Sequence, residues 1–124
     1  MFQRLERIRA VMKQYTNESQ TAKLIELGFE KPSSIASVEP IYGMGGISVA
    51  KAYSIGELIE LLPPKIEAEM EDESDDEYAW LSFEEGWDVL YRSGYYIVER
   101  IRHSKELIDA IFDMLVQLKV EGVI

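Results

Sequence analysis

Few residues of this chain could carry out acid–base or nucleophilic chemistry. It has no cysteine and one histidine, His103, which excludes disulfides, thiolate nucleophiles, iron–sulfur clusters and cysteine-based zinc sites. A catalytic histidine needs an orienting group and a nucleophile within reach. Glu106 follows three residues later, but no stretch resembles a nucleophile elbow. We therefore interpret His103 as a surface residue at the start of a helix.

Paired carboxylates offer a second route to catalysis, because two acids about 5 to 9 Å apart can serve as acid and base or nucleophile in glycoside hydrolysis. Asp88 and Glu99 fall on neighbouring predicted strands. They lie on the more polar face, beside Arg92, which favours solvated side chains over a catalytic pair. A small hydrolase with a carboxylate-based site stays an alternative, while the sequence as a whole leans towards a protein that is not an enzyme.

Acidic residues gather in the second part of the chain. Up to Ala52 there are seven basic and five acidic residues, and after it six basic and eighteen acidic ones. Six of the seven residues from Glu71 to Glu77 are carboxylates, and such a run repels itself, so we predict a solvated acidic loop at 71–77. An EF-hand loop starting at Asp72 would need a glycine where Glu77 stands, which leaves adventitious divalent-cation binding as the alternative.

Residues 32–52 are rich in glycine, serine and proline and keep no sustained period, which predicts a long loop with short strand pieces around 47–49. The run Gly43-Met44-Gly45-Gly46 within it resembles a phosphate-binding turn only weakly. No Gly-Lys-Ser/Thr follows it, and the next residues do not open a helix. We expect no cofactor and no metal.

Four helices are predicted from apolar residues spaced by three and four. The first covers residues 2–15 and is basic. The second follows Thr16 or Asn17 as N-cap, and the third has Ser54 as N-cap. The last is predicted to start after Ser104. The predicted stop signals of the second, third and last helices are Gly28, Pro63 and Gly122, respectively.

From Lys65 the apolar period changes to two, which predicts strands at 65–70, 78–83, 87–92 and 95–100. A tight turn at Ser93–Gly94 would pair Val89 with Val98, and Tyr91 with Tyr96, on a core face. We expect one domain over residues 1–124, of class α+β. Its antiparallel β-meander of about four strands should be packed on one face by the N-terminal and C-terminal helices.

Four stretches resemble, in the same order, pieces of small uncharacterised proteins encoded by prophages and mobile elements of gut bacteria. Together they cover 40 of the 124 residues. This resemblance implies no activity, ligand or catalytic residue. The stretches are LIELGF (24–29), AYSIGELIELLP (52–63), WDVLY (87–91) and ELIDAIFDMLVQLKVEG (106–122).

The sequence favours a small acidic protein that binds other proteins. Exposed tryptophan and tyrosine anchor interfaces, and Tyr78, Trp80 and Tyr95 are the candidate partner surface, unless the N-terminal helices cover them. We expect a non-catalytic interaction module of a prophage or mobile element, with a protein partner or a second copy bound to it. The alternative is a nucleic-acid mimic that inhibits a DNA-binding enzyme.

The expected compartment is the cytoplasm. Arginines occupy the N-terminal stretch where a signal peptide is apolar, and the longest uncharged run, from Pro40 to Ala50, is eleven residues. A membrane span needs about 20. We expect no membrane association, and no direct DNA binding, because phosphate contacts need Lys and Arg on a surface that here has a net charge of −10.

Overall fold

The computed structural model describes residues 13–41, 46–67, 76–93 and 97–124. Most of the predicted first helix, the start of the glycine-rich run and most of the acidic block lie outside these residues. The helices are α2 (Glu18–Glu26), α3 (Ile55–Leu61) and α4 (Leu107–Val120), and the strands are β1 (Ile35–Ile41), β2 (Gly46–Lys51), β3 (Lys65–Ile66), β4 (Glu77–Phe83), β5 (Trp87–Ser93) and β6 (Val98–Ser104).

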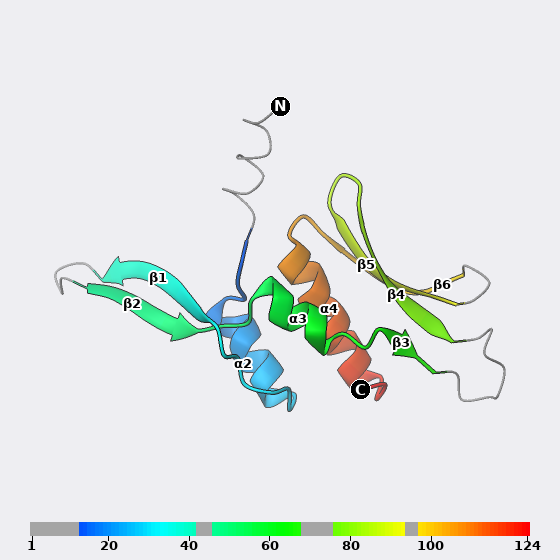
Figure 1. The fold of residues 1–124 in the computed structure, drawn as a ribbon, viewed down its shortest axis with the longest axis horizontal. Coiled ribbons are helices and arrows are strands. Elements are labelled where there is room, and N and C mark those ends of the chain that lie inside the picture. Colours follow the sequence, from blue (N-terminus) through cyan, green and yellow to red (C-terminus); the bar gives the residue numbers. More distant parts are fainter. Residues whose placement is uncertain (1–12, 42–45, 68–75, 94–96) are drawn as a thin grey trace.

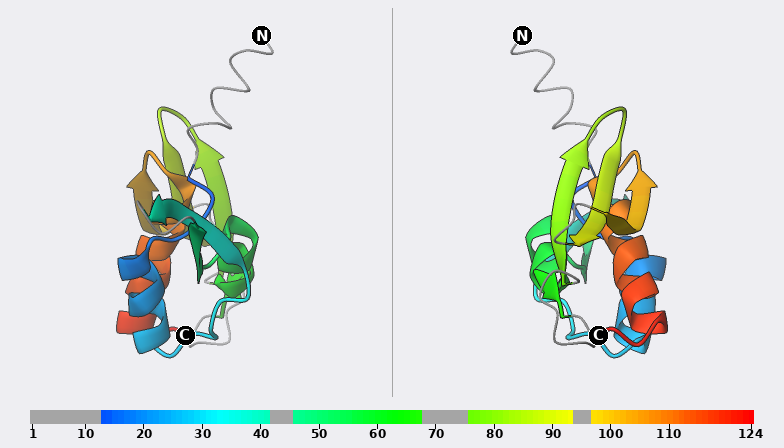
Figure 2. Two further views of the ribbon diagram at one scale, coloured as in Figure 1. Left: turned by 90° about the vertical axis from the view of Figure 1, so that its left-hand side faces the viewer. Right: turned by 90° about the vertical axis from the view of Figure 1, so that its right-hand side faces the viewer.

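Strands β3 to β6 form an antiparallel meander in the order β3-β4-β5-β6. Helix α4 packs against β5 and β6, and α3 packs against α4. Figure 1 places these helices on one side of the sheet, and the turned views of Figure 2 show β4, β5 and β6 next to one another. The predicted α+β class, with a meander covered on one face by helices, is confirmed.

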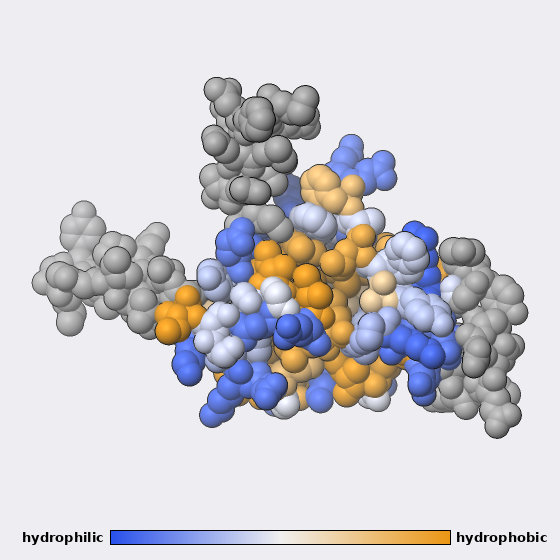
Figure 3. All heavy atoms as spheres, viewed as in Figure 1, coloured by the Kyte–Doolittle hydropathy of each residue, from blue (hydrophilic) through white to orange (hydrophobic). Residues whose placement is uncertain are grey.

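The core lies between this sheet and the helices. Helix α4 contributes fully buried side chains along one stripe, among them Ile111 and Leu115. Leu24 of α2, Leu58 of α3 and Val89 of β5 complete it. Figure 3 shows apolar residues gathered in the middle of the molecule, with hydrophilic residues around them.

The predicted starts of α2 and α3 are confirmed. The Asn17 side chain accepts a hydrogen bond from the Gln20 amide at 2.8 Å, and the Gln20 side chain accepts one from the Asn17 amide at 3.1 Å. Ser54 and Glu57 make the same reciprocal pair at α3. Each motif satisfies amide groups that a helix start leaves unpaired.

The start of α4 differs from the prediction. Ser104 is the last residue of β6, opposite Trp87, and Glu106 is the N-cap, without a side-chain cap hydrogen bond. Its carboxylate instead accepts a hydrogen bond from the Lys13 amide at 2.9 Å. Ser104 therefore belongs to β6 and is not the N-cap of α4. The end of α4 is as predicted, because the Val123 amide donates to the Leu118 carbonyl beyond Gly122.

The prediction of a long loop at 32–52 is wrong. Strands β1 and β2 pair as an antiparallel hairpin, with an irregular register between Ser37 and Pro40, and Figure 1 shows it projecting away from the helices. The irregularity is a physical reason why the sequence shows no period of two there, because a bulge shifts the alternation of side chains. The predicted strand pieces at 47–49 fall within β2.

The predicted pairing of the strand before the acidic block with the strand after it is confirmed, although β3 has only two residues. The last two residues of the block are not a solvated loop. Asp76 is buried and forms an ion pair with Lys65 at 3.2 Å. Glu77 lies in β4 and pairs with Arg100, so these two carboxylates stabilise the sheet.

The predicted register between β5 and β6 is wrong by four residues. Tyr91 lies opposite Arg100, and Leu90 opposite Ile101. The Ser93 amide donates to the Ile97 carbonyl at 2.9 Å, so the connection is longer than a two-residue turn. As predicted, Val89 and Tyr91 belong to the core, but Arg100 and Arg102, rather than apolar residues of β6, reach towards α4.

Candidate functional site

The side of the meander that faces away from the helices presents an apolar surface. Strand residues alternate between faces, and Ala79, Val89 and Tyr91 contact the core while their neighbours do not. We call the opposite side the outer sheet face. It comprises Tyr78, Trp80, Leu90, Arg92, Val98 and Ile101.

A row of apolar side chains crosses the centre of this face. Trp80 lies opposite Leu90, which in turn lies opposite Ile101, so three strands contribute one residue each. Leu90 is only 4% exposed, whereas Trp80 is 47% and Ile101 51% exposed. The two outer residues of the row therefore shield the central one and are themselves half in solvent.

A tyrosine and an arginine extend this row on one side. Tyr78 is 43% exposed and lies opposite Arg92. The guanidinium carbon of Arg92 lies 4.8 Å from the centroid of the Trp80 ring, within the range of a cation–π contact. The Arg92 Nε is buried and has no hydrogen-bond partner among the described residues.

Strand β6 has an irregular register at the same place. Arg92 pairs with Val98, although the preceding residue Tyr91 pairs with Arg100, so Val98 and Glu99 together oppose Arg92. Val98 is 46% exposed. Glu99 is also exposed and takes part in none of the ion pairs between described residues. At this end of the outer sheet face, Arg92 and the adjacent Glu99 are thus a cation and an anion without ionic partners among the described residues.

The candidate catalytic groups are arranged differently from the prediction. Asp88 lies opposite His103, not Glu99, and its Oδ1 is 2.6 Å from the His103 Nδ1. His103 is in β6 and is not at a helix start. Ser82 lies opposite Asp88 on the other side, two strand spacings or about 10 Å from the histidine. A serine–histidine–aspartate relay needs the histidine in the middle, and this order does not provide it.

Two of the three residues predicted as a partner surface come together. Tyr78 and Trp80 lie two positions apart on β4, on the outer sheet face, while Tyr95 lies outside the described residues. Leu90 and Arg92 were placed on this side of the sheet but were not named as part of the partner surface, and Ile101 was missed. The apolar alternation of β5 and β6 indicated them, but only the correct register aligns them with Trp80.

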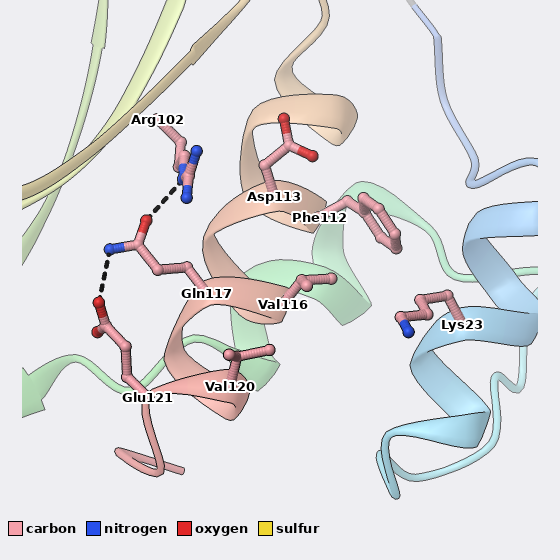
Figure 4. Close-up of a pocket in the computed structure, with 8 residues that line it drawn as sticks. All are labelled: Lys23, Arg102, Phe112, Asp113, Val116, Gln117, Val120 and Glu121. Carbon is pink, nitrogen blue, oxygen red and sulfur yellow. Dashed lines mark hydrogen bonds between the residues drawn. The ribbon is translucent and has the colours of Figure 1, made fainter.

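A groove along α4 is the second candidate surface. It has a volume of about 640 Å³ and runs between α2 and β6, with Phe112, Val116 and Val120 directed into it (Figure 4). Burial raises the pKa of the Asp113 carboxyl at its edge, although the nearby charge of Arg102 opposes this. The remaining lining residues are Lys23, Gln117 and Glu121.

Three of the polar side chains of this groove, those of Arg102, Gln117 and Glu121, are hydrogen-bonded to one another. Arg102 donates from Nε to the Gln117 side chain at 2.6 Å, and Gln117 donates to Glu121 at 3.1 Å. Figure 4 shows this chain of hydrogen bonds along one wall. A binding pocket usually offers a few polar groups that converge on a ligand. The outer sheet face, with a continuous row of exposed apolar side chains, is therefore the stronger candidate.

Residues 13–41, 46–67, 76–93 and 97–124 contain no group of three or more histidine or acidic side chains that could hold a metal ion. None of the helices formed by these residues is long and apolar enough to cross a membrane. No protein-family model, curated protein or solved structure matches the chain.

Proposed function

We propose that this chain is a non-catalytic protein-interaction module that binds through its outer sheet face. The observation that carries the proposal is the row of Trp80, Leu90 and Ile101, an apolar strip open to solvent on a sheet whose other face is the core. Single exposed apolar residues are ordinary on protein surfaces, whereas contiguous apolar patches mark interaction sites.

The residue types support the same function. Tryptophan, tyrosine and arginine dominate the binding energy of protein interfaces, and Trp80, Arg92 and Tyr78 are neighbours here. Stacking of Arg92 on Trp80 fixes both side chains before a partner arrives, which reduces the entropy lost on binding. The proposal extends to the setting that the sequence resemblance implies, a prophage or mobile element.

Nucleic-acid mimicry is the alternative and rests on the net charge. In the described part of the second half, several carboxylates are already neutralised within the fold. Arg100 pairs with Glu77 and Glu121, and Lys65 pairs with Asp76. These carboxylates are not presented as a row of unpaired charges such as phosphates form, so the mimic is the weaker proposal.

Affinity purification at two salt concentrations tests the function. We expect the tagged protein, from a nuclease-treated bacterial lysate, to retain a protein partner in about 0.5 M salt, where charges are screened beyond a few Å. Trp80→Ala should reduce the retained partner by roughly tenfold or more, because truncating a central anchor costs about 2 kcal/mol.

The control variant is Ile59→Ala, which removes a similarly exposed apolar side chain from α3. It should retain the partner, and thermal melts should show that both variants are folded. Equal retention by wild type and Trp80→Ala would contradict the role of this face. Recovery of a nucleic-acid enzyme that is lost on raising the salt would favour the mimic.

A further inference from the structure

The outer sheet face exposes a large apolar area. Tyr78, Trp80, Val98 and Ile101 are each close to half exposed, which leaves on the order of 400 Å² of apolar surface. A standard protein interface buries about 800 Å² per partner, of which roughly 55–65% is apolar. The face therefore supplies most of the apolar part of one such interface.

Several features of the sheet edges disfavour the addition of another strand, although β3 covers only Glu77 and Tyr78 of β4. Strand β3, at one edge, has only two residues. Strand β6, at the other edge, has an irregular register and directs Arg100 and Arg102 towards α4. Short edge strands, bulges and inward-pointing charges all disfavour the addition of another strand.

The charges on this face favour a partner with the same surface. Asp88 is already paired with His103, which leaves Arg92 as a cation and Glu99 as an anion without ionic partners among the described residues. A two-fold symmetric interface requires one patch to supply both members of every contact. The outer sheet face meets this requirement with one charge of each sign, although the chain as a whole has a net charge of −10.

We propose that a second copy of the chain occupies the outer sheet face in a two-fold homodimer. Trp80 packs within this interface, and Arg92 of each copy pairs with Glu99 of the other. The inference rests on the proposed function and names the partner of the same surface. It is distinct from that function, because a monomeric chain could still bind a different protein through this face.

Sedimentation equilibrium of the purified chain tests the assembly. We expect a dimer at micromolar concentration, and we expect Trp80→Asp to weaken it at least a hundredfold. The matched control Ile59→Asp places the same charge at an exposed position of α3. It should leave the dimer intact. A monomer at every concentration tested, or a dimer that Trp80→Asp leaves unchanged, would overturn the proposal.

A charge exchange between copies tests the pairing. Arg92→Glu and Glu99→Arg should each weaken the dimer about tenfold or more, because like charges then meet across the two-fold axis. An equimolar mixture of the two variants should form a heterodimer of near wild-type affinity, since opposite charges again face each other at both contacts. Pairing within one copy cannot produce this rescue, so a mixture no tighter than the variants alone would overturn the Arg92–Glu99 contact.

The outcomes separate this inference from the proposed function. A monomeric chain that retains another protein, and loses it with Trp80→Ala, would refute the homodimer and leave the interaction function standing. A dimer that depends on Trp80 and on the charge exchange supports both. A monomer whose lysate capture is unaffected by Trp80→Ala would refute both.

Discussion

Glu57 is one carboxylate that joins two segments of the chain. It accepts hydrogen bonds from the Ser33 amide at 3.0 Å and from the Ser34 and Ser54 amides at 3.2 Å. It therefore completes the cap of α3 and also fixes the chain just before β1. Partial burial raises its pKa, but the hydrogen bonds from Ser33, Ser34 and Ser54 outweigh this effect and lower the pKa to about 2.

Glu57→Gln should destabilise the fold in a pH-dependent way. The variant keeps an acceptor oxygen but loses the charge, which should cost about 1 kcal/mol near neutral pH. A carboxyl whose pKa is lower in the folded state stabilises it above the unfolded pKa of about 4.5. That contribution is lost as the pH falls towards 2, so the difference between wild type and variant should shrink over this range in denaturant titrations.

Glu60→Gln is the control for this prediction, because Glu60 is exposed on the same helix. It should leave the free energy of unfolding within about 0.5 kcal/mol of wild type at every pH. If Glu57→Gln and Glu60→Gln showed the same pH dependence, the stabilising role of the Glu57 carboxylate would be refuted.

At the scale of elements, signals confined to a few residues predicted the structure well. The capping pairs at Asn17 and Ser54, and the stop at Gly28, depend only on neighbours three or four residues away. Ser104 was also a predicted N-cap. In the structure it lies in β6 and pairs with Trp87, which lies seventeen positions earlier in the sequence. Local patterns do not reveal such competition between a helix start and a strand end.

The candidate site was predicted only in part, because it depends on register. The alternation of β4 placed Tyr78 and Trp80 on one face, as the structure shows. The alternation of β6 was also visible, but the length of the turn and the irregularity at Glu99 decide which residue lies beside Leu90. A shift of four residues changes every cross-strand neighbour, and the irregularity places Val98, predicted on the core face, on the outer sheet face. The positions of Ile101 and Glu99 beside Leu90 and Arg92 were therefore missed.

The turn between β4 and β5 depends on Gly86. Its φ of +140° is rarely adopted by other residues, and a Cβ there would lie 2.8 Å from the His103 ring and 3.1 Å from the Ser104 carbonyl. Gly86→Ala should cost about 3 kcal/mol, because strain and a collision with backbone act together. Chemical denaturation would measure the loss.

Gly28→Ala separates these two causes. Gly28 also has a positive φ, of +93°, but no atom lies within 4 Å of the added Cβ. This variant should lose only about 1 kcal/mol, from backbone strain. Equal losses for the two alanine variants would show that the contact with His103 and Ser104 costs nothing.

Across the whole molecule, stability should be distributed unevenly. The hairpin of β1 and β2 projects from the helices in Figure 1, and a two-stranded hairpin alone is at best marginally stable in water. Strand β5 has a neighbour on each side and buries Val89 and Tyr91 against α4. Local opening should therefore occur in the hairpin long before the sheet unfolds.

Hydrogen exchange measured by mass spectrometry should show this difference. Peptides from β1 and β2 should exchange at least about a hundredfold faster than peptides from β5, since exchange follows the free energy of local opening. The α3 peptide is a useful internal reference, because Leu58 is fully buried. Protection of the hairpin equal to that of β5 would show that another surface packs against it.

The attachment of Lys13 to α4 has a consequence for synthesis of the chain. Its amide donates to Glu106 at 2.9 Å, and its ammonium group pairs with Asp109 at 2.8 Å, contacts that span 93 and 96 positions of sequence. The same helix supplies most of the core. A ribosome adds about 5–20 residues per second, so the nascent chain waits several seconds before either contact can form. During this interval the apolar strands emerge before the helix that covers them. A chaperone that binds extended apolar segments would bind the nascent chain at this stage.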